Sequence, residues 1–192
     1  MALPNTDWLR HSLTVSGPAE DVGALQAAAA GAGIIPWQFP DLDAIEEDHR
    51  LALLRPPDGS PGLPPADAKV LASQLREAME NHQLRVLAVA ATSRVCPFDL
   101  HALLPLPADI LRRGPADAVG LAWLRAHWGV VQPLRRVECL TGKTDGRLRR
   151  SARLDYTFWS ADWTPWPAFR TLRQNWPRLI FGIQPQYEDS RG

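Results

Sequence analysis

The chain has 192 residues, 45% of them hydrophobic and 22% charged, and its formal net charge is zero. This composition excludes a disordered chain, and the lack of any apolar run near the ~20 residues of a membrane span excludes a transmembrane one. The length suits a single domain with a large insertion.

The sequence predicts a cytoplasmic protein with no membrane partner. Residues 1–7 lack the basic and apolar stretches of a secretory signal. The two cysteines, Cys96 and Cys139, stand in apolar, strand-like surroundings, which favours free buried thiols over a disulfide.

Charge is distributed unevenly along the chain. Residues 1–68 carry 10 acidic and 3 basic residues, whereas residues 69–192 carry 11 acidic and 18 basic ones. Such polarity can serve nucleic-acid contact, pairing between the two halves or head-to-tail self-association, and it also fits two separately solvated faces.

The first predicted elements are a strand and a helix. Residues 11–16 alternate Leu13 and Val15 with polar neighbours, which is the pattern of a half-buried strand. Residues 18–30 begin with a proline and two acidic residues and carry an apolar stripe, so they predict a helix that ends near Gly31.

A long insertion is predicted at about residues 34–96. Its first part, residues 34–65, is acidic and then rich in proline and glycine, so we expect largely irregular backbone there. Residues 66–91 show helical periodicity and predict a long packed helix. The expected packing stripe of this helix includes Leu71, Leu75 and Met79.

The segment after the insertion resembles a strand. Residues 96–107 combine apolar residues with closing prolines. In an extended chain Phe98 and Leu100 would face one side, and Asp99 and His101 the other.

The C-terminal third predicts two helices and three strands. An apolar stripe predicts a helix between Pro115 and Gly129. Alternating patterns predict strands at 134–140, 150–160 and 179–185. Residues 166–176 form the second helical stripe, with Asp162 or Thr164 as the candidate N-cap.

These elements add up to an α+β fold. The order β–α at the start and β–β–α–β at the end is typical of a ferredoxin-like α/β sandwich, in which helices cover one face of an antiparallel sheet. We expect one such domain over residues 1–192, interrupted by a helical and loop insertion at about 34–96.

Four segments carry a family resemblance. They read WLRHSLTVSG at 8–17, FDLHALLPLP at 98–107, WG at 128–129 and FWSADWTPW at 158–166. Their order and spacing resemble the Api92-like proteins, a bacterial group associated with phages and plasmids. The resemblance covers roughly residues 7–33 and 97–188. It implies a ferredoxin-like domain and a bacterial origin, and it implies no particular chemistry.

The chain departs from the family pattern at one point. The family continues its Trp-Gly pair with a lysine and a second tryptophan, whereas Val130, Val131 and Gln132 follow here. Any site that depends on that lysine is absent or altered in this chain.

No pattern in the sequence demands catalysis, a metal or a cofactor. No Cys or His pair has metal-site spacing, and no serine stands in a Gly-x-Ser-x-Gly turn. Asp99, His101 and Asp162 are the polar residues that could converge in a cleft between core and insertion, as an enzyme would need. The alternative is that Asp162 caps a helix and Asp99 faces solvent.

A basic hairpin is the first candidate contact surface. Seven basic and two acidic residues lie between positions 133 and 153. The basic ones are Arg135, Arg136, Lys143, Arg147, Arg149, Arg150 and Arg153. Such a cluster suits phosphate attraction, although it lacks the Gly-aromatic signature of the sheet proteins that bind RNA. Alternatively, the hairpin is solvated or neutralises the acidic stretch 41–48.

A tryptophan-rich turn is the second candidate. Trp163 and Trp166 stand among prolines, where indole rings can be rigid and partly exposed and so suit a binding surface. The alternative is a lid over the core. We expect the lid for Trp163 and exposure for Trp166.

Three functional hypotheses follow. The first is a non-catalytic binding or regulatory module that uses the basic hairpin and the tryptophan turn, with a protein partner or a second copy as ligand. The second is a nucleic-acid-associated accessory protein of mobile elements. The third is an enzyme with a cleft beside the insertion.

Overall fold

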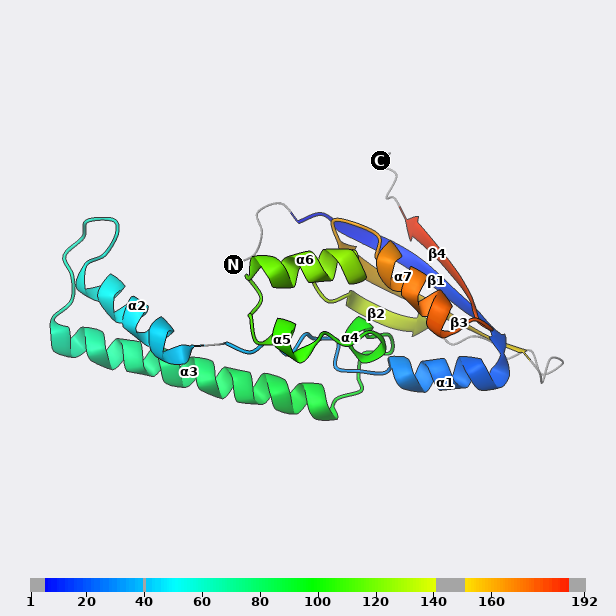
Figure 1. The fold of residues 1–192 in the computed structure, drawn as a ribbon, viewed down its shortest axis with the longest axis horizontal. Helices are drawn as coiled ribbons and strands as arrows, with labels where there is room; N and C mark the ends of the chain where they lie inside the picture. Colours follow the sequence, from blue (N-terminus) through cyan, green and yellow to red (C-terminus); the bar gives the residue numbers. More distant parts are fainter. Residues whose placement is uncertain (1–5, 40, 141–150, 187–192) are drawn as a thin grey trace.

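The computed structural model describes residues 6–39, 41–140 and 151–186 (Figure 1). At its centre is one four-stranded antiparallel sheet in the order β2–β3–β1–β4. The strands are β1 (Trp8–Pro18), β2 (Arg135–Leu140), β3 (Ser151–Ala161) and β4 (Ile180–Gln186). The α+β prediction is confirmed, as are the strands predicted at 11–16, 134–140, 150–160 and 179–185.

Alternation of side chains gives the sheet two different faces. In β1, His11, Leu13 and Val15 are buried, whereas Ser12 and Thr14 between them are only half-buried. Leu13 stands opposite Tyr156 of β3 and Ile183 of β4, so apolar side chains of three strands share one face.

Helices cover that apolar face. They are α1 (Ala19–Ala29), α6 (Ala118–His127) and α7 (Trp166–Asn175), with the short α4 (Leu100–Leu103) and α5 (Ala108–Leu111) between them (Figure 1). Phe98, Phe158 and Phe169 stack at the centre of the core, with ring centroids 6.0 to 6.5 Å apart. The predicted helices at 18–30 and 166–176 are therefore confirmed, and both pack on the sheet.

The predicted cap of α7 is wrong. Its N-cap residue is Pro165, and no side chain accepts a hydrogen bond at this end. Prolines near the first turn reduce the number of amide hydrogens that need a partner. Asp162 and Thr164 make other contacts, described below.

The insertion contains a helix that the sequence did not predict. Residues 41–65 are not largely irregular, because α2 (Leu42–Leu54) occupies half of them. Its N-cap Asp41 accepts a hydrogen bond from the Ala44 amide at 2.8 Å, and Asp43 in the first turn favours the positive end of the helix. The acidic run is therefore a helix start.

Helices α2 and α3 (Pro65–Thr92) form an arm that projects away from the sheet (Figure 1). Ala68 and Ala72 are the fully buried residues of α3, whereas Leu71 is 42% exposed. The predicted long helix is confirmed, but Leu71 does not belong to its packing stripe. The buried residues of α3 are small alanines, which allow α2 to pack closely against it.

Three acidic residues of the stretch 41–48 form ion pairs inside the arm. The Arg76 guanidinium of α3 lies 3.0 Å from Asp43 and 3.6 Å from Glu46. Arg50 pairs with Glu47 at 2.6 Å. The hypothesis that the basic hairpin neutralises this stretch is wrong for these three acidic residues.

The predicted strand at 96–107 is also wrong. Gly31 and Cys96 form an isolated β-bridge, after which the chain turns into α4. Asp99 does not face solvent. It is 6% exposed and is the N-cap of α4, with its carboxylate accepting from the His101 amide at 2.8 Å. A capping aspartate therefore overrides the strand-like pattern.

Two further expectations concern the whole chain. Both cysteines are free thiols, as predicted, but they are half-buried and not fully buried. None of the helices in the described part of the chain combines the length and the apolar composition that crossing a membrane requires.

Candidate nucleic-acid interface

The sheet face opposite the helices carries a row of arginine and tryptophan side chains. Arg135 of β2 stands opposite Trp159 of β3, Trp159 opposite Arg10 of β1, and Arg10 opposite Gln186 of β4. Residues directly opposite on neighbouring strands project from the same face. These four side chains form the arginine–tryptophan row, and none of the described helices covers it (Figure 1).

A second indole borders the row. Trp8 stands opposite Ala161, two residues beyond Trp159, so the two tryptophans are diagonal neighbours on one face. The Arg135 guanidinium lies 4.3 Å from the centroid of a Trp8 ring, within cation–π distance. The small side chain of Ala161 leaves the space that Arg135 crosses to reach Trp8.

A β-bulge shapes the outer edge of the row. The register of β2 shifts between Arg135 and Glu138, so two residues there oppose the single residue Phe158 of β3. Arg136, inside the bulge, has a left-handed φ of 47° and is exposed. The bulge thus keeps Arg135 and Glu138 on the open face and adds a third exposed guanidinium beside the row.

The three arginines at this end have no carboxylate partner among the described residues. Arg10, Arg135 and Arg136 are all exposed, and none forms an ion pair there. Among the described residues, Arg135 contacts the neutral Gln132 amide at 3.4 Å and the Trp8 ring. No described carboxylate therefore balances the positive charge of these three arginines.

Arg153 differs from these arginines. It lies 2.8 Å from Asp155 in the same strand, and Asp155 also accepts from the Thr14 hydroxyl. This ion pair and its hydrogen bonds lower the pKa of Asp155 and raise that of Arg153. Arg153 is thus already neutralised. The other predicted basic residues, Lys143, Arg147, Arg149 and Arg150, lie outside the described residues.

The tryptophan turn, residues 161–167, exposes both of its indoles. Trp163 is 72% exposed and Trp166 is 48% exposed. The exposure predicted for Trp166 is confirmed, and the lid predicted for Trp163 is wrong. Asp162 has a left-handed φ of 62° and exchanges two hydrogen bonds with the Asp7 backbone, at 2.7 and 3.0 Å. It ties the turn to the segment before β1 instead of capping α7.

His11 on β1 supports the tryptophan turn from the protein interior. The Nδ1 of this fully buried ring lies 3.0 Å from the Leu9 carbonyl, and its Nε2 lies 2.9 Å from Thr164 Oγ1. A carbonyl can only accept, so Nδ1 carries the proton and Nε2 accepts from the Thr164 hydroxyl. Burial lowers the pKa of His11, consistent with a neutral ring.

The same support extends to the turn's backbone and to the core. Ser160 donates to the Trp163 carbonyl at 2.6 Å, and the His11 ring stacks on Phe158 at 5.0 Å. The sequence interpretation missed His11. Its position was the available signal, because it lies on the same side of β1 as Leu13 and Val15.

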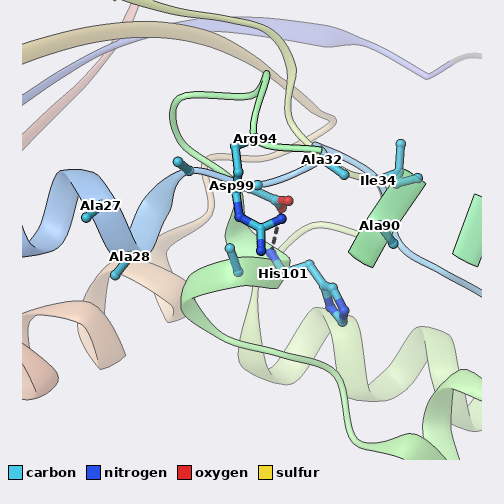
Figure 2. Close-up of a pocket in the computed structure, with 11 residues that line it drawn as sticks. Ala27, Ala28, Ala32, Ile34, Ala90, Arg94, Asp99 and His101 are labelled. Carbon is cyan, nitrogen blue, oxygen red and sulfur yellow. Dashed lines mark hydrogen bonds between the residues drawn. The ribbon is translucent and has the colours of Figure 1, made fainter. Parts of the chain in front are cut away.

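The pocket beside α4 contains two of the predicted catalytic candidates (Figure 2). It has a volume of about 320 Å³ and lies between α1, the end of α3 and α4. Both carboxylate oxygens of Asp99 are engaged, since one accepts from the His101 amide and the other from the Gly33 amide. Figure 2 shows the His101 ring turned away from that carboxylate. Arg94, which also lines the pocket, donates to the Ser93 carbonyl at 2.7 Å.

His101 is held away from acid–base partners. Its Nδ1 accepts from the Leu106 amide at 3.3 Å, and its ring meets the edge of Trp128. Burial lowers the pKa of His101, while nearby Asp99 opposes the shift. Asp162 does not line this pocket. The three residues of the enzyme hypothesis are therefore not brought together.

No group of three His, Cys, Asp or Glu side chains in the described ranges could hold a metal ion. Comparison with known proteins finds no matching family, no matching curated protein and no matching solved structure. The function of this chain is therefore inferred from its surface chemistry.

Proposed function

We propose that this protein is a non-catalytic binding module whose ligand is nucleic acid and whose contact surface is the arginine–tryptophan row with Arg136. Nucleic-acid affinity is dominated by phosphate contacts, which release counterions when cationic side chains neutralise them. Arginine suits this contact because its planar guanidinium donates to phosphate oxygens in pairs.

One observation carries the proposal. Arg10, Arg135 and Arg136 are exposed at one end of an uncovered sheet face, and none has a carboxylate partner there. Some other described arginines, such as Arg50, Arg76 and Arg153, are paired with acidic side chains, and others, such as Arg55 and Arg85 on the arm, are exposed without such a partner. What distinguishes this face is that three such arginines are grouped beside two indoles. Unpaired guanidinium groups beside two indoles form a cationic and aromatic surface that fits a polyanion with aromatic bases.

The pocket beside α4 gives weaker support to an enzyme. A general acid–base site needs titratable groups within hydrogen-bond reach of a common reacting atom. Asp99 is occupied as a helix cap, and the His101 ring is turned away from it. We therefore assign structural roles to both residues.

The strand order supports a finer assignment of fold and family. The sheet order β2–β3–β1–β4, with crossovers through α1 and α7, is the order expected for a ferredoxin-like α/β sandwich carrying the arm as an insertion. With the four sequence segments described above, it favours an Api92-like relative. In that setting the module would act as a cytoplasmic bacterial accessory protein of mobile elements.

The test is the salt dependence of oligonucleotide binding. Fluorescence polarisation with a labelled 12-mer should show affinity falling steeply between low and physiological salt. Changing Arg10, Arg135 and Arg136 together to Gln should lower the slope of log affinity against log salt by roughly 2, at about 0.7 per lost contact on a single strand. No binding by the wild-type protein at low salt would reject the proposal.

A control variant on the arm tests whether the position of the lost charges matters, or only the lower net charge of the protein. Arg55 and Arg85 lie exposed on the arm, so changing both to Gln removes positive charge away from the row and should leave affinity nearly unchanged. A separate variant with Lys143, Arg147, Arg149 and Arg150 changed to Gln measures the remaining basic residues. Equal losses in the arm and row variants would show nonspecific attraction to the whole protein.

A second candidate function rests on the tryptophan turn. Two exposed indoles on a turn braced by His11 and Ser160 are features of a protein-contact surface. Self-association is the simplest form of such contact. Sedimentation should then show a concentration-dependent dimer that the double change Trp163→Ser and Trp166→Ser converts to monomer. A wild-type monomer at all concentrations would remove self-association.

A further inference from the structure

We infer that the arginine–tryptophan row stacks unpaired bases, so the nucleic acid that this face takes is single-stranded. This inference rests on the proposed function and names the substrate class of the same site. It is carried by the placement of Trp159 between Arg135 and Arg10, neither of which has a carboxylate partner among the described residues, and by the packing of Arg135 on Trp8.

Cations and an aromatic ring alternate along the row. Trp159 has Arg135 on one side and Arg10 on the other, each one strand away. Neighbouring strands lie about 4.8 Å apart, so the two arginine positions are separated by roughly 10 Å. A flexible single strand can place a base on the ring and its flanking phosphates on the two guanidinium groups.

The Trp8–Arg135 pair widens this platform. A guanidinium over an aromatic face offers a second planar surface, because unpaired bases stack on arginine as well as on aromatic rings. Arg135 Cζ lies 4.3 Å from the Trp8 ring centroid, and Trp8 occupies the strand position diagonal to Trp159. Two stacking surfaces therefore lie side by side on one face.

The charges of the neighbouring rows on the open face limit where a nucleic-acid strand can lie. The next row across the open face consists of Glu138, Thr157, Ser12 and Gln184, and the row beyond it contains Asp155. These rows offer carboxylates and neutral groups in place of unpaired cations. A polyanion is thus attracted to the first row and directed across the strands, because a path along β2 would meet the exposed Glu138 carboxylate. Asp155 is already paired with Arg153 and adds little repulsion.

Duplex DNA or RNA fits this surface less well. In a duplex the base faces are stacked on one another, so Trp159 and Trp8 could not contact them. Reading a duplex requires a helix or strand ribbon that enters a groove. None of the described helices lies on this face of the sheet (Figure 1). Ring faces and cations on an open sheet select bases that are free to leave their stack.

The experiment compares ligands on the unmodified protein. The probes are labelled dT12, U12, an abasic 12-mer with the same phosphates, and a 12-base-pair duplex, all at one low salt concentration. We expect dT12 and U12 to bind within a few-fold of each other, because both present phosphates and base faces. We expect the abasic strand to bind about 5- to 150-fold more weakly, the range that stacking of one base provides.

Variants then locate the stacking ring. Trp159→Ala should weaken dT12 binding by a similar factor and leave abasic binding unchanged, whereas Trp159→Phe should retain most of the affinity. Leu84→Ala is the control, since Leu84 is an exposed apolar side chain on the arm, outside the row and the tryptophan turn. It should leave dT12 binding unchanged. Circular dichroism and thermal unfolding check that each variant is folded.

The outcomes separate the two proposals. If abasic, duplex and dT12 ligands bind equally and Trp159→Ala has no effect, the stacking inference is wrong while nucleic-acid binding stands. If none of the ligands binds at low salt, both are wrong. If Trp159→Ala fails to fold, the wild-type comparison of abasic strand with dT12 still decides the question.

Discussion

Gly129 lies directly against Pro167, with no room for a side chain between them. A β-carbon on Gly129 would lie 2.5 Å from Cδ of Pro167 and 3.4 Å from Cα of Pro165. Gly129 also has a left-handed φ of 82°. The end of α6 therefore braces the tryptophan turn from one side, while His11 braces it from the other.

Gly129→Ala should destabilise the protein for two reasons. The left-handed backbone costs about 1–3 kcal/mol for a residue with a side chain. The overlap with the rigid Pro167 ring adds overpacking, also worth about 1–3 kcal/mol. Gly59→Ala is the control, because Gly59 has φ of 75° and nothing within 4 Å of its β-carbon position. If denaturant unfolding gives equal losses of unfolding free energy for the two variants, the Pro167 ring moves aside without a measurable cost.

The tryptophans should differ widely in their contribution to stability. Trp128 is 1% exposed and donates from Nε1 to the Leu104 carbonyl, so Trp128→Ala should lower the free energy of unfolding by about 3–5 kcal/mol. Trp163→Ala should change it by only about 0.5 kcal/mol, because the ring is largely in solvent. Trp166→Ala should fall between them. A large loss for Trp163→Ala would contradict its exposed position.

Stability should decrease as the pH falls below about 6.5, the ordinary pKa of histidine. Burial lowers the pKa of His11 and of His101 in the folded protein. Between the lowered folded value and the unfolded value, the unfolded chain binds more protons, so acid favours unfolding. The full contribution is present above pH 6.5 and is lost as the pH falls towards the folded pKa.

Single variants test whether His11 and His101 cause this pH dependence. The free energy of unfolding measured from pH 7.5 to 5 should show a shallower slope in His11→Asn and in His101→Asn than in the wild type. The His11→Asn protein should also be less stable at neutral pH, because Thr164 loses its partner. An unchanged slope in both variants would show that carboxylates alone produce the acid sensitivity.

Packing of the arm depends on the small residues of α3. Ala72→Leu places three extra carbons under α2, where Ala72 is fully buried, and should cost about 1–3 kcal/mol. Ala88→Leu is the control on the exposed side of the same helix. Hydrogen exchange over Leu42–Leu54 should speed up in the first variant only. Unchanged protection in Ala72→Leu would mean that α2 does not depend on the close approach.

The strands and the large helices could be predicted because their signals are local. Alternation at Leu13 and Val15, and the stripe that includes Phe169 and Leu172, indicate the buried face without knowledge of the partner. The helix α2 was missed because Asp41 and Asp43 were interpreted as a solvated acidic loop. They are the cap and first turn of a helix. Ile45 and Leu53 on this helix are partly buried.

The candidate interface depends on information that the sequence does not contain. The charge pattern indicates Arg135 and Arg136 as candidates but does not indicate Arg10 or Trp159. Arg135, Trp159 and Arg10 share a row only because of the register of three strands. The β-bulge at Arg136 shifts the register of β2 against β3, and no local sequence pattern predicts this bulge. Trp8 was not singled out at all, since its relation to Arg135 is set by strand pairing.

Both outer edges of the sheet are interrupted. The bulge at Arg136 disrupts the ladder of β2, and Pro185 in β4 has no amide hydrogen to donate. An unbroken edge would be a template for adding a strand from another chain, and breaks of this kind suppress such growth. Strand addition and fibril-like stacking of copies at these two edges are therefore disfavoured.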